Sequence, residues 1–491
     1  MRADRSEMLT LWCAAGALAA GLIGYSQTLA FAWDEGFHLL AAQLILRGKR
    51  PYLDFIHPQA PLYAYWNATL MRLFGESWRV VHVVSSLAVT GASLLTAQFV
   101  LTRLEDRAWR LAGALSAMVL VELNSTILWY GTIGQPYAMC LLLTVAAFRL
   151  TVLAAERDAE LSGSGVEFCA AAGFCAGAAA ACSLLTAPFA PVLLAWTWFH
   201  CGGKRLKKCA VFVGAAVIPF LPLLWLFALS PRQVLFGVFQ YHALYRSVDW
   251  PGAGKQNLDV ATAWMNNYEP VLLICLAALG LSYIVGRSDW EPRDKREFYL
   301  CVWLIAAESA YLLIPRPTFG RYYMFAIPFL AILSAVGLYA IASQIASLRR
   351  PWLYPLALTL LLVGAFVKYS IDSSDDYSWG DLEKVSAKVD AVTAPNAPLF
   401  ADEHTYFLLK REPPSGMEYM DSHKLQLPDA VANVMHVIPM AKLTAQVAAG
   451  RFATISICNN DDRITAFGLP GQYTQTAEVA SCSVFWARKG K

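Results

Sequence analysis

The sequence predicts an α-helical polytopic membrane protein, with about eleven transmembrane helices and a small α/β domain after them. Three observations lead to this prediction. The 491 residues are 57% hydrophobic and 15% charged, whereas soluble globular chains average about 45–50% apolar and about 25% charged residues. Apolar runs recur as far as residue 370, most of them close to the ~20 residues that a helix needs to cross a bilayer. Beyond residue 370 the sequence becomes polar, and its apolar stretches are short.

The apolar runs supply the predicted membrane helices. The first run exceeds the ~7–15 apolar residues of a signal peptide, so we interpret it as a retained helix. Alanine and glycine are dense at 170–182, and small residues let membrane helices pack closely. The predicted helices cover residues 9–31, 79–101, 109–124, 136–154, 167–182, 184–200, 209–229, 267–285, 298–314, 322–345 and 352–369.

Lysines and arginines in the short loops set the expected orientation. Short cytoplasmic loops are enriched in these residues, and the loop at 125–135 has none. With the N-terminus inside, the loops at 32–78, 230–266 and 315–321 and the C-terminal domain lie outside. We therefore expect a multi-pass protein of the inner (plasma) membrane with an extracytoplasmic C-terminal domain. The inside loops carry Arg103, Arg107, Arg110, Arg157, Lys204, Arg205, Lys207, Lys208, Arg287, Arg293, Lys295, Arg296, Arg349 and Arg350.

A polar stretch at 372–376 divides the chain into a membrane domain at 1–370 and a soluble domain at 371–491. Cys458 and Cys482 are the two cysteines of the soluble domain, and they could pair in an oxidising compartment. The adjacent Asp402, Glu403 and His404 favour a structural role over a metal site. Helical or alternating spacing of apolar residues predicts helices at 382–392, 430–435 and 440–449, and strands at 398–401, 452–458 and 482–487.

Two adjacent carboxylates follow the first apolar run, in Trp33-Asp34-Glu35-Gly36-Phe37-His38. Charge inside or at the mouth of a membrane segment is often functional, although a solvated helix end gives the same pattern. Neighbouring residues of a helix do not share a face, so Asp34 can face a cavity while Glu35 serves structure. The rest of this loop predicts two helices in the interface plane, at about 39–46 and 61–74.

This block resembles the first outer loop of GT-C membrane glycosyltransferases, such as protein O-mannosyltransferases and lipid A aminoarabinose transferases. The resemblance covers Trp33–Trp66, through Asp-Glu-Gly, Arg-Gly-Lys-Arg-Pro-Tyr-Leu-Asp-Phe and His-Pro-x-x-Pro-Leu-Tyr. A weaker match at Pro315–Leu330 contains Arg-Tyr-Tyr. The resemblance implies inverting transfer of a sugar from a polyprenyl-phosphate donor to a hydroxyl of a glycan, lipid or protein on the outer face. It makes Asp34 the catalytic base, and it favours Arg321 over Arg316 as the contact to the donor phosphate.

Residues around these positions complete the expected site. A carboxylate within reach of a hydroxyl can act as a base, and arginine binds phosphate oxygens bidentately. Glu35, His38 and His57 leave room for a divalent metal, but no ligand is assigned and no cofactor is predicted. The expected substrate-binding residues are Glu35, Lys49, Arg50, Asp54, His57, Tyr63, His242, Arg316, Arg321 and Tyr322.

Other functions remain open at this stage. A transporter or flippase for a lipid-linked or small solute usually shows internal repeats and charges at midplane, of which only Glu122 and Glu308 are candidates. A glycan ligase or polymerase would need its acids and arginines mainly in the loop at 230–266, which is either a lid or a connector. The net charge of +3, without a basic patch interleaved with aromatic residues, argues against nucleic-acid binding. Membrane lipids are expected partners.

Overall fold

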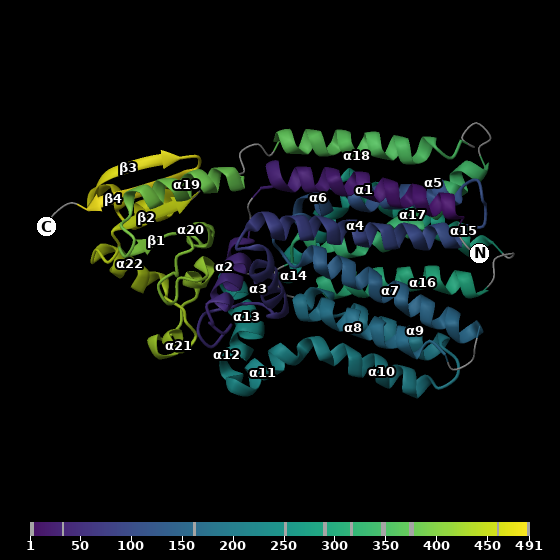
Figure 1. The fold of residues 1–491 in the computed structure, drawn as a ribbon, viewed down its shortest axis with the longest axis horizontal. Helices are drawn as coiled ribbons and strands as arrows, with labels where there is room; N and C mark the ends of the chain where they lie inside the picture. Colours follow the sequence, from purple (N-terminus) through teal and green to yellow (C-terminus); the bar gives the residue numbers. More distant parts are fainter. Residues whose placement is uncertain are drawn as a thin grey trace.

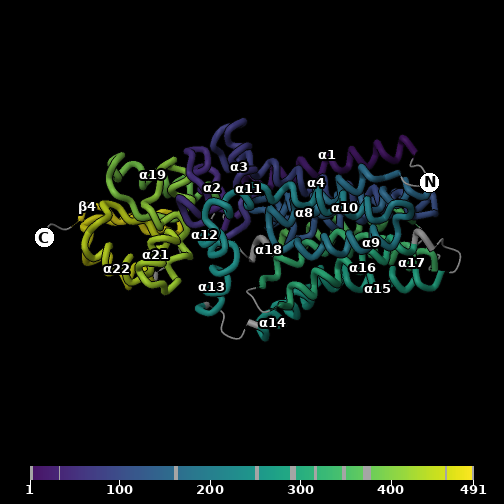
Figure 2. The backbone as a smooth tube through the Cα atoms, turned by 90° about the horizontal axis from the view of Figure 1, so that it is seen from below, coloured from purple at the N-terminus to yellow at the C-terminus, as the bar shows by residue number. Residues whose placement is uncertain are grey.

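The chain folds into a long helical bundle that carries a small mixed domain at one end (Figure 1). The N-terminus lies at the far end of the bundle, and the C-terminus lies in the mixed domain. The loop at 34–77, which we call the first outer loop after its predicted orientation, and the loop that begins at residue 230 lie between the bundle and this domain in both views (Figure 2). This computed structural model describes residues 4–31, 34–160, 164–249, 253–287, 292–314, 318–344, 350–372, 378–458 and 461–488.

Each predicted membrane segment coincides with a helix or with a broken helix. Pro219 and Pro222 explain one break, because proline removes a backbone donor and clashes with the preceding turn. The helices are α1 (Arg5–Thr28), α4 (Trp78–Arg103), α5 (Arg110–Glu122), α6 (Ser125–Gly131), α7 (Tyr137–Glu160), α8 (Val166–Cys182), α9 (Phe189–His200), α10 (Arg205–Val217), α11 (Leu221–Leu229), α15 (Tyr268–Gly286), α16 (Pro292–Leu312), α17 (Ile327–Gln344) and α18 (Leu353–Asp372).

Fewer than eleven helices qualify as membrane spans when a helix must be both long enough and apolar enough to cross a bilayer. Among the described residues, 6 helices are long and apolar enough to cross a membrane, and up to 7 if α5 and α6 form one span bent by 56°. The other predicted spans are shorter, broken or more charged. A polytopic helical fold is therefore confirmed, whereas the count of eleven stays a prediction.

Glycines set how closely the bundle helices approach. A Cβ atom at Gly337 would lie 2.0 Å from the Leu276 carbonyl oxygen, and one at Gly177 would lie 2.0 Å from the Ala216 carbonyl oxygen. Only glycine fits these two positions, where α17 meets α15 and α8 meets α10. The close packing predicted from the small residues at 170–182 is therefore confirmed.

The first outer loop contains both expected helices, α2 (Gly36–Leu46) and α3 (Leu62–Phe74). The helix α3 is amphipathic and exposes Leu73 and Phe74. The helix α2 differs from the expectation, because it is buried from Gly36 to Leu44 and packs against α3 and α20. A helix that is apolar on every side belongs inside a protein, so α2 lies under the C-terminal domain and not on an open interface.

The loop after α11 is structured. It forms α12 (Pro231–Leu235), a π-helical turn η3 (Phe236–Gln240), α13 (Tyr241–Asp249) and α14 (Ala253–Met265). A Cβ at Gly237 would lie 2.7 Å from both the His57 carbonyl oxygen and the Tyr52 ring. The His242 ring also donates to the Pro58 carbonyl oxygen at 2.7 Å. This loop is therefore packed onto the first outer loop.

The C-terminal domain is a small sheet with helices, as predicted. The sheet has four strands in the order β1-β2-β4-β3, and β3 was not predicted. The strand β1 is parallel to β2, and β4 is antiparallel to both β2 and β3. Cys458 and Cys482 are opposite each other in β2 and β4 and form a disulfide. The elements are α19 (Trp379–Val392), β1 (Leu399–Phe400), α20 (Glu403–Leu409), η6 (Met420–Lys424), α21 (Asp429–Val434), α22 (Met440–Ala448), β2 (Thr454–Cys458), α23 (Asp461–Ala466), α24 (Leu469–Gln472), β3 (Tyr473–Val479) and β4 (Cys482–Arg488).

Candidate active site

A cavity of about 330 Å³ lies where the outer loops meet the ends of the bundle helices. Predicted residues from three separate parts of the sequence line it, namely Asp34, His242, Arg321 and Tyr322. Part of its lining is apolar and aromatic, with Leu184 and Leu185 before α9, Val238 and Phe239 in η3, and Phe319. The cavity therefore joins a polar centre to an apolar surface, as expected for a ligand with a charged head and a hydrocarbon tail.

Asp34 and Arg321 form the polar centre of this cavity. The Asp34 Oδ2 atom lies 3.3 Å from the Arg321 Nη2 atom, and the Asp34 side chain is 49% exposed against 10% for Arg321. The Arg321 Nε–H donates to the Tyr137 hydroxyl at 3.3 Å, and the guanidinium lies 4.3 Å from the centre of the Phe319 ring. Arg321 is thus held in place while the Asp34 carboxylate stays accessible.

Local sequence explains how these two side chains meet. Asp34 sits in the turn just before α2, and Arg321 sits in the 3₁₀ turn η4 (Gly320–Ala326) just before α17. A Cβ at Gly36 would lie 2.7 Å from the His404 ring, so glycine is required for the turn to pass under α20. The C-terminal domain is thereby brought against the first outer loop immediately beside Asp34.

Glu35 has a different environment from its neighbour. It is fully buried, and its carboxylate accepts hydrogen bonds from His82 Nε2 at 2.8 Å, the Gly134 amide at 2.5 Å and Trp379 Nε1 at 2.6 Å. Burial alone raises the pKa of Glu35, but His82 and these donors bring the pKa below its usual value. Glu35 is therefore an ionised structural residue that does not line the cavity.

His82 completes this buried network. Its Nδ1 atom lies 2.9 Å from the Ser26 carbonyl oxygen, while its Nε2 atom faces Glu35. Both ring nitrogens therefore lie within hydrogen-bond distance of oxygen atoms. The network of His82 and Glu35 links the end of α1, α4, the turn before α7 and the C-terminal domain.

The other predicted residues that the structure describes do not line the cavity. Lys49 pairs with Glu412 at 2.7 Å, and Arg50 pairs with Asp54 at 2.9 Å on the surface. His57 and Tyr63 are buried, and burial lowers the pKa of His57 to about 4, so that its ring is neutral. Arg316 lies outside the described residues. We expected substrate contacts from these positions. Those that the structure describes contact other residues of the protein and do not line the cavity.

The possible metal position does not fit a metal. Glu35, which would supply the carboxylate, has both oxygens occupied by N–H donors. Within the described ranges, no three His, Cys, Asp or Glu side chains come together closely enough to hold a metal ion. Asp402 accepts from the Thr405 amide at 2.8 Å as the cap of α20, in agreement with a structural role.

Sequence reasoning missed the residues that the C-terminal domain adds. Tyr419 and Asp421 from the region of η6 line the cavity, and Trp379 from α19 binds Glu35. These residues lie in stretches without a regular spacing of apolar residues and without a motif. The sequence therefore offered no reason to expect that they contact the membrane domain.

The fold defined by this bundle and cap is that of the GT-C membrane glycosyltransferases, as the sequence resemblance implied. ArnT from Cupriavidus metallidurans bound to undecaprenyl phosphate has a TM-score of 0.67 at 12% identity, over 96% of this chain and 97% of that one. The oligosaccharyltransferase AglB from Archaeoglobus fulgidus, in complex with an inhibitory peptide and a dolichol-phosphate, has a TM-score of 0.52 at 13% identity, over 94% and 71%. No protein-family model and no curated protein sequence matches the chain.

Proposed function

We propose that this protein transfers a sugar from a polyprenyl-phosphate donor to a hydroxyl of a glycan, lipid or protein acceptor. The observation that carries the proposal is the pairing of Asp34 with Arg321 in one cavity. This carboxylate and guanidinium lie at the end of an apolar bundle, beside an apolar wall. Solved structures with the same fold contain polyprenyl phosphates, which supports a lipid-linked donor.

Each group in the cavity has a role in this reaction. The Asp34 carboxylate removes the proton from the acceptor hydroxyl, and the hydroxyl oxygen forms a bond to the anomeric carbon. The bond between that carbon and the phosphate oxygen breaks, and the phosphate leaves with the bonding electrons. Arg321 offsets the negative charge that develops on the phosphate. A single displacement of this kind inverts the anomeric carbon.

The donor's hydrocarbon chain would lie along the apolar part of the lining, near Leu185 and Phe239. The phosphate would reach Arg321, which is the cation that lines the cavity within the described residues. A donor delivered in the membrane needs no nucleotide-binding loop, and the sequence contains none.

We further propose that the C-terminal domain lies outside the inner membrane. The disulfide between Cys458 and Cys482 supports this placement, because disulfides persist in oxidising compartments and are rare in the cytosol. The distribution of lysine and arginine over the loops supports the same orientation.

The transporter alternative gains no support from Glu122, one of the two acids on which it would depend. Glu122 accepts hydrogen bonds from the Thr90 hydroxyl at 2.7 Å and the Ser93 hydroxyl at 2.6 Å. These bonds hold Glu122 between α4 and α5. Its surroundings indicate a packing role and do not favour a transport path.

Mass spectrometry of cell-envelope lipids and glycans tests the proposal. Cells without the gene should lack one sugar on an envelope molecule and accumulate the lipid-linked sugar, and the wild-type gene should restore both. Asp34→Asn should fail to restore them although the protein is expressed, whereas Asp390→Asn should succeed, because Asp390 lies exposed on α19. Full restoration by Asp34→Asn would remove the base assignment, and an unchanged envelope in the deletion strain would contradict the glycosyl transfer itself.

A further inference from the structure

A second cavity, of about 270 Å³, adjoins the first at Asp34. The two cavities share Asp34, Phe37, Tyr419 and Asp421. Apart from the first outer loop at 34–37, the second cavity is lined by the C-terminal domain. Its described lining contains no residue of a membrane-spanning helix. A substrate in this cavity would therefore approach Asp34 from the opposite side to a donor held in the membrane.

Polar side chains form a large part of the lining of the second cavity. Asp402, Glu403, His404, Asp421 and Arg463 contribute to its lining. Burial raises the pKa of Glu403 to about 8, so this carboxyl group carries its proton at neutral pH. The cavity thus contains hydrogen-bond acceptors in the aspartates and donors in Arg463 and Glu403, and the aromatic residues Phe37 and Tyr419 also line it.

One polar atom in this wall lacks a protein partner within the described residues. Ser456 is 3% exposed and lines the cavity, and its hydroxyl makes no hydrogen bond there. A buried hydroxyl without a hydrogen-bond partner is unfavourable. The cavity wall therefore contains an unsatisfied hydrogen-bonding group at Ser456.

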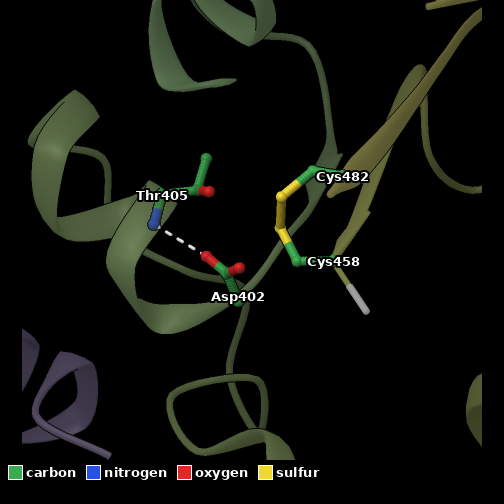
Figure 3. Close-up of a disulfide and its surroundings, with 4 residues drawn as sticks. All are labelled: Asp402, Thr405, Cys458 and Cys482. Carbon is green, nitrogen blue, oxygen red and sulfur yellow. Dashed lines mark hydrogen bonds between the residues drawn. A yellow bond between two sulfur atoms is a disulfide. The ribbon is translucent and has the colours of Figure 1, made fainter. Parts of the chain in front are cut away.

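The walls that carry these groups are fixed. The disulfide between Cys458 and Cys482 ties the end of β2 to β4 two residues after Ser456. Across from it, Asp402 caps α20 through the Thr405 amide (Figure 3). The aromatic rings of Phe37 and Tyr419 are 4.8 Å apart at the junction with the first cavity. A rigid polar pocket of this kind suits a defined ligand better than a mobile lipid.

On the basis of the proposed function, we propose that the second cavity binds the acceptor and that the acceptor presents the uncharged, hydroxyl-rich end of a glycan. Carboxylates, a guanidinium and the free Ser456 hydroxyl match sugar hydroxyls, and the two rings offer flat surfaces to a sugar face. A phosphorylated head group would meet like charge at Asp402 and Asp421, which is unfavourable. The acceptor hydroxyl would then meet Asp34 with the donor on the other side, as an in-line displacement requires.

Binding experiments with the purified full-length protein test this assignment. The probes are the methyl glycosides of glucose, galactose and mannose and the corresponding 6-phosphates, followed by saturation-transfer NMR, and undecaprenyl phosphate, followed by a titration. At least one neutral glycoside should bind more strongly than its 6-phosphate. Ser456→Ala and Arg463→Gln should reduce that signal at least fivefold but change the Kd for undecaprenyl phosphate by less than twofold, and Asp390→Asn should change neither.

The outcomes separate the two proposals. Failure of every neutral glycoside to bind, stronger binding of the 6-phosphates, or glycoside binding that both variants leave intact would overturn the acceptor assignment. A wild-type protein that binds a glycoside but not undecaprenyl phosphate would contradict the donor half of the proposed function instead. Binding of undecaprenyl phosphate to the two variants also reports that they are folded.

Discussion

Adjacent residues in this chain have separate tasks. Asp34 is half exposed in the cavity and pairs with Arg321, whereas Glu35 is buried and binds His82, Gly134 and Trp379. The sequence predicted this division, because neighbours on a helix face different ways. It also singled out Arg321 through its motif. It could not predict the contacts of Glu35 with α4 and α19, because these form between segments far apart in the chain.

The first prediction at the residue scale concerns Arg321. Arg321→Ala should lower kcat by about 10²–10³-fold, because a group that stabilises developing charge is typically worth that much. The effect on donor use should exceed the effect on acceptor use, as measured by kinetics with varied donor and acceptor concentrations. Arg321→Lys should restore part of the rate, since it keeps the charge but loses the bidentate geometry. Arg79→Ala, which removes a cation paired with Glu383 at 3.0 Å, is the control, and an unchanged donor KM and kcat in Arg321→Ala would exclude the phosphate contact.

The second prediction at this scale concerns pH. Burial raises the pKa of Glu403 and Glu418 to about 8, from 4.5 in an unfolded chain. Between these values the folded protein keeps protons that the unfolded chain releases, so the free energy of unfolding falls as pH rises. The fall is at most roughly 1.4 kcal/mol per pH unit for each group. Thermal unfolding at pH 6 and pH 8 should show a smaller drop in Tm for Glu403→Gln than for wild type, and equal drops would contradict this account.

At the scale of elements, apolar runs were sufficient to place the bundle helices. Their ends and breaks were harder, because the run at 209–229 is broken at η2 (Ile218–Phe220) and the run at 109–124 ends before the bent continuation α6. The strand β3 was missed because it is an edge strand whose residues from Thr474 to Thr476 are exposed. An exposed polar strand carries no alternation of burial that a sequence could reveal.

The contact of α19 with α2 and α4 gives a prediction at this scale. Trp379→Phe should remove the donor to the Glu35 carboxylate while keeping an aromatic ring against Trp78, which lies stacked at 5.1 Å. The loss of a buried hydrogen bond to a charged group costs about 1–3 kcal/mol, so the Tm should fall. Trp78→Phe is the matched control, because its indole bonds the more exposed Glu383 at 3.0 Å. An equal fall in Tm for both variants would show that the hydrogen bond to Glu35 stabilises the protein no more than the hydrogen bond to Glu383.

At the scale of the whole molecule, both cavities meet where the membrane bundle and the C-terminal domain join. The sequence indicated the two parts and their boundary, and it supplied the polytopic class from composition alone. It could not indicate that Tyr419 and Asp421 reach the cavity of Asp34. That contact depends on how the whole C-terminal domain is seated on α2.

The orientation of the molecule can be tested by labelling. A cysteine introduced at Glu478, which is exposed on β3, should react with an impermeant maleimide in intact spheroplasts. A cysteine introduced at Lys207, which is exposed in the first turn of α10, should react only after permeabilisation. The protein without an added cysteine supplies the background. Labelling of position 207 in intact spheroplasts, and of position 478 only after permeabilisation, would place the C-terminal domain in the cytoplasm.

The bond from Trp379 to Glu35 has a consequence for how such proteins can be rebuilt. In a chimera that joins this bundle to a foreign cap, the buried Glu35 carboxylate would lose the hydrogen bond that Trp379 Nε1 donates. The cap is therefore not an interchangeable module, because its Trp379 completes the hydrogen bonds of a carboxylate buried at the end of the bundle. Engineering of new acceptor preference should start with substitutions inside the native cap.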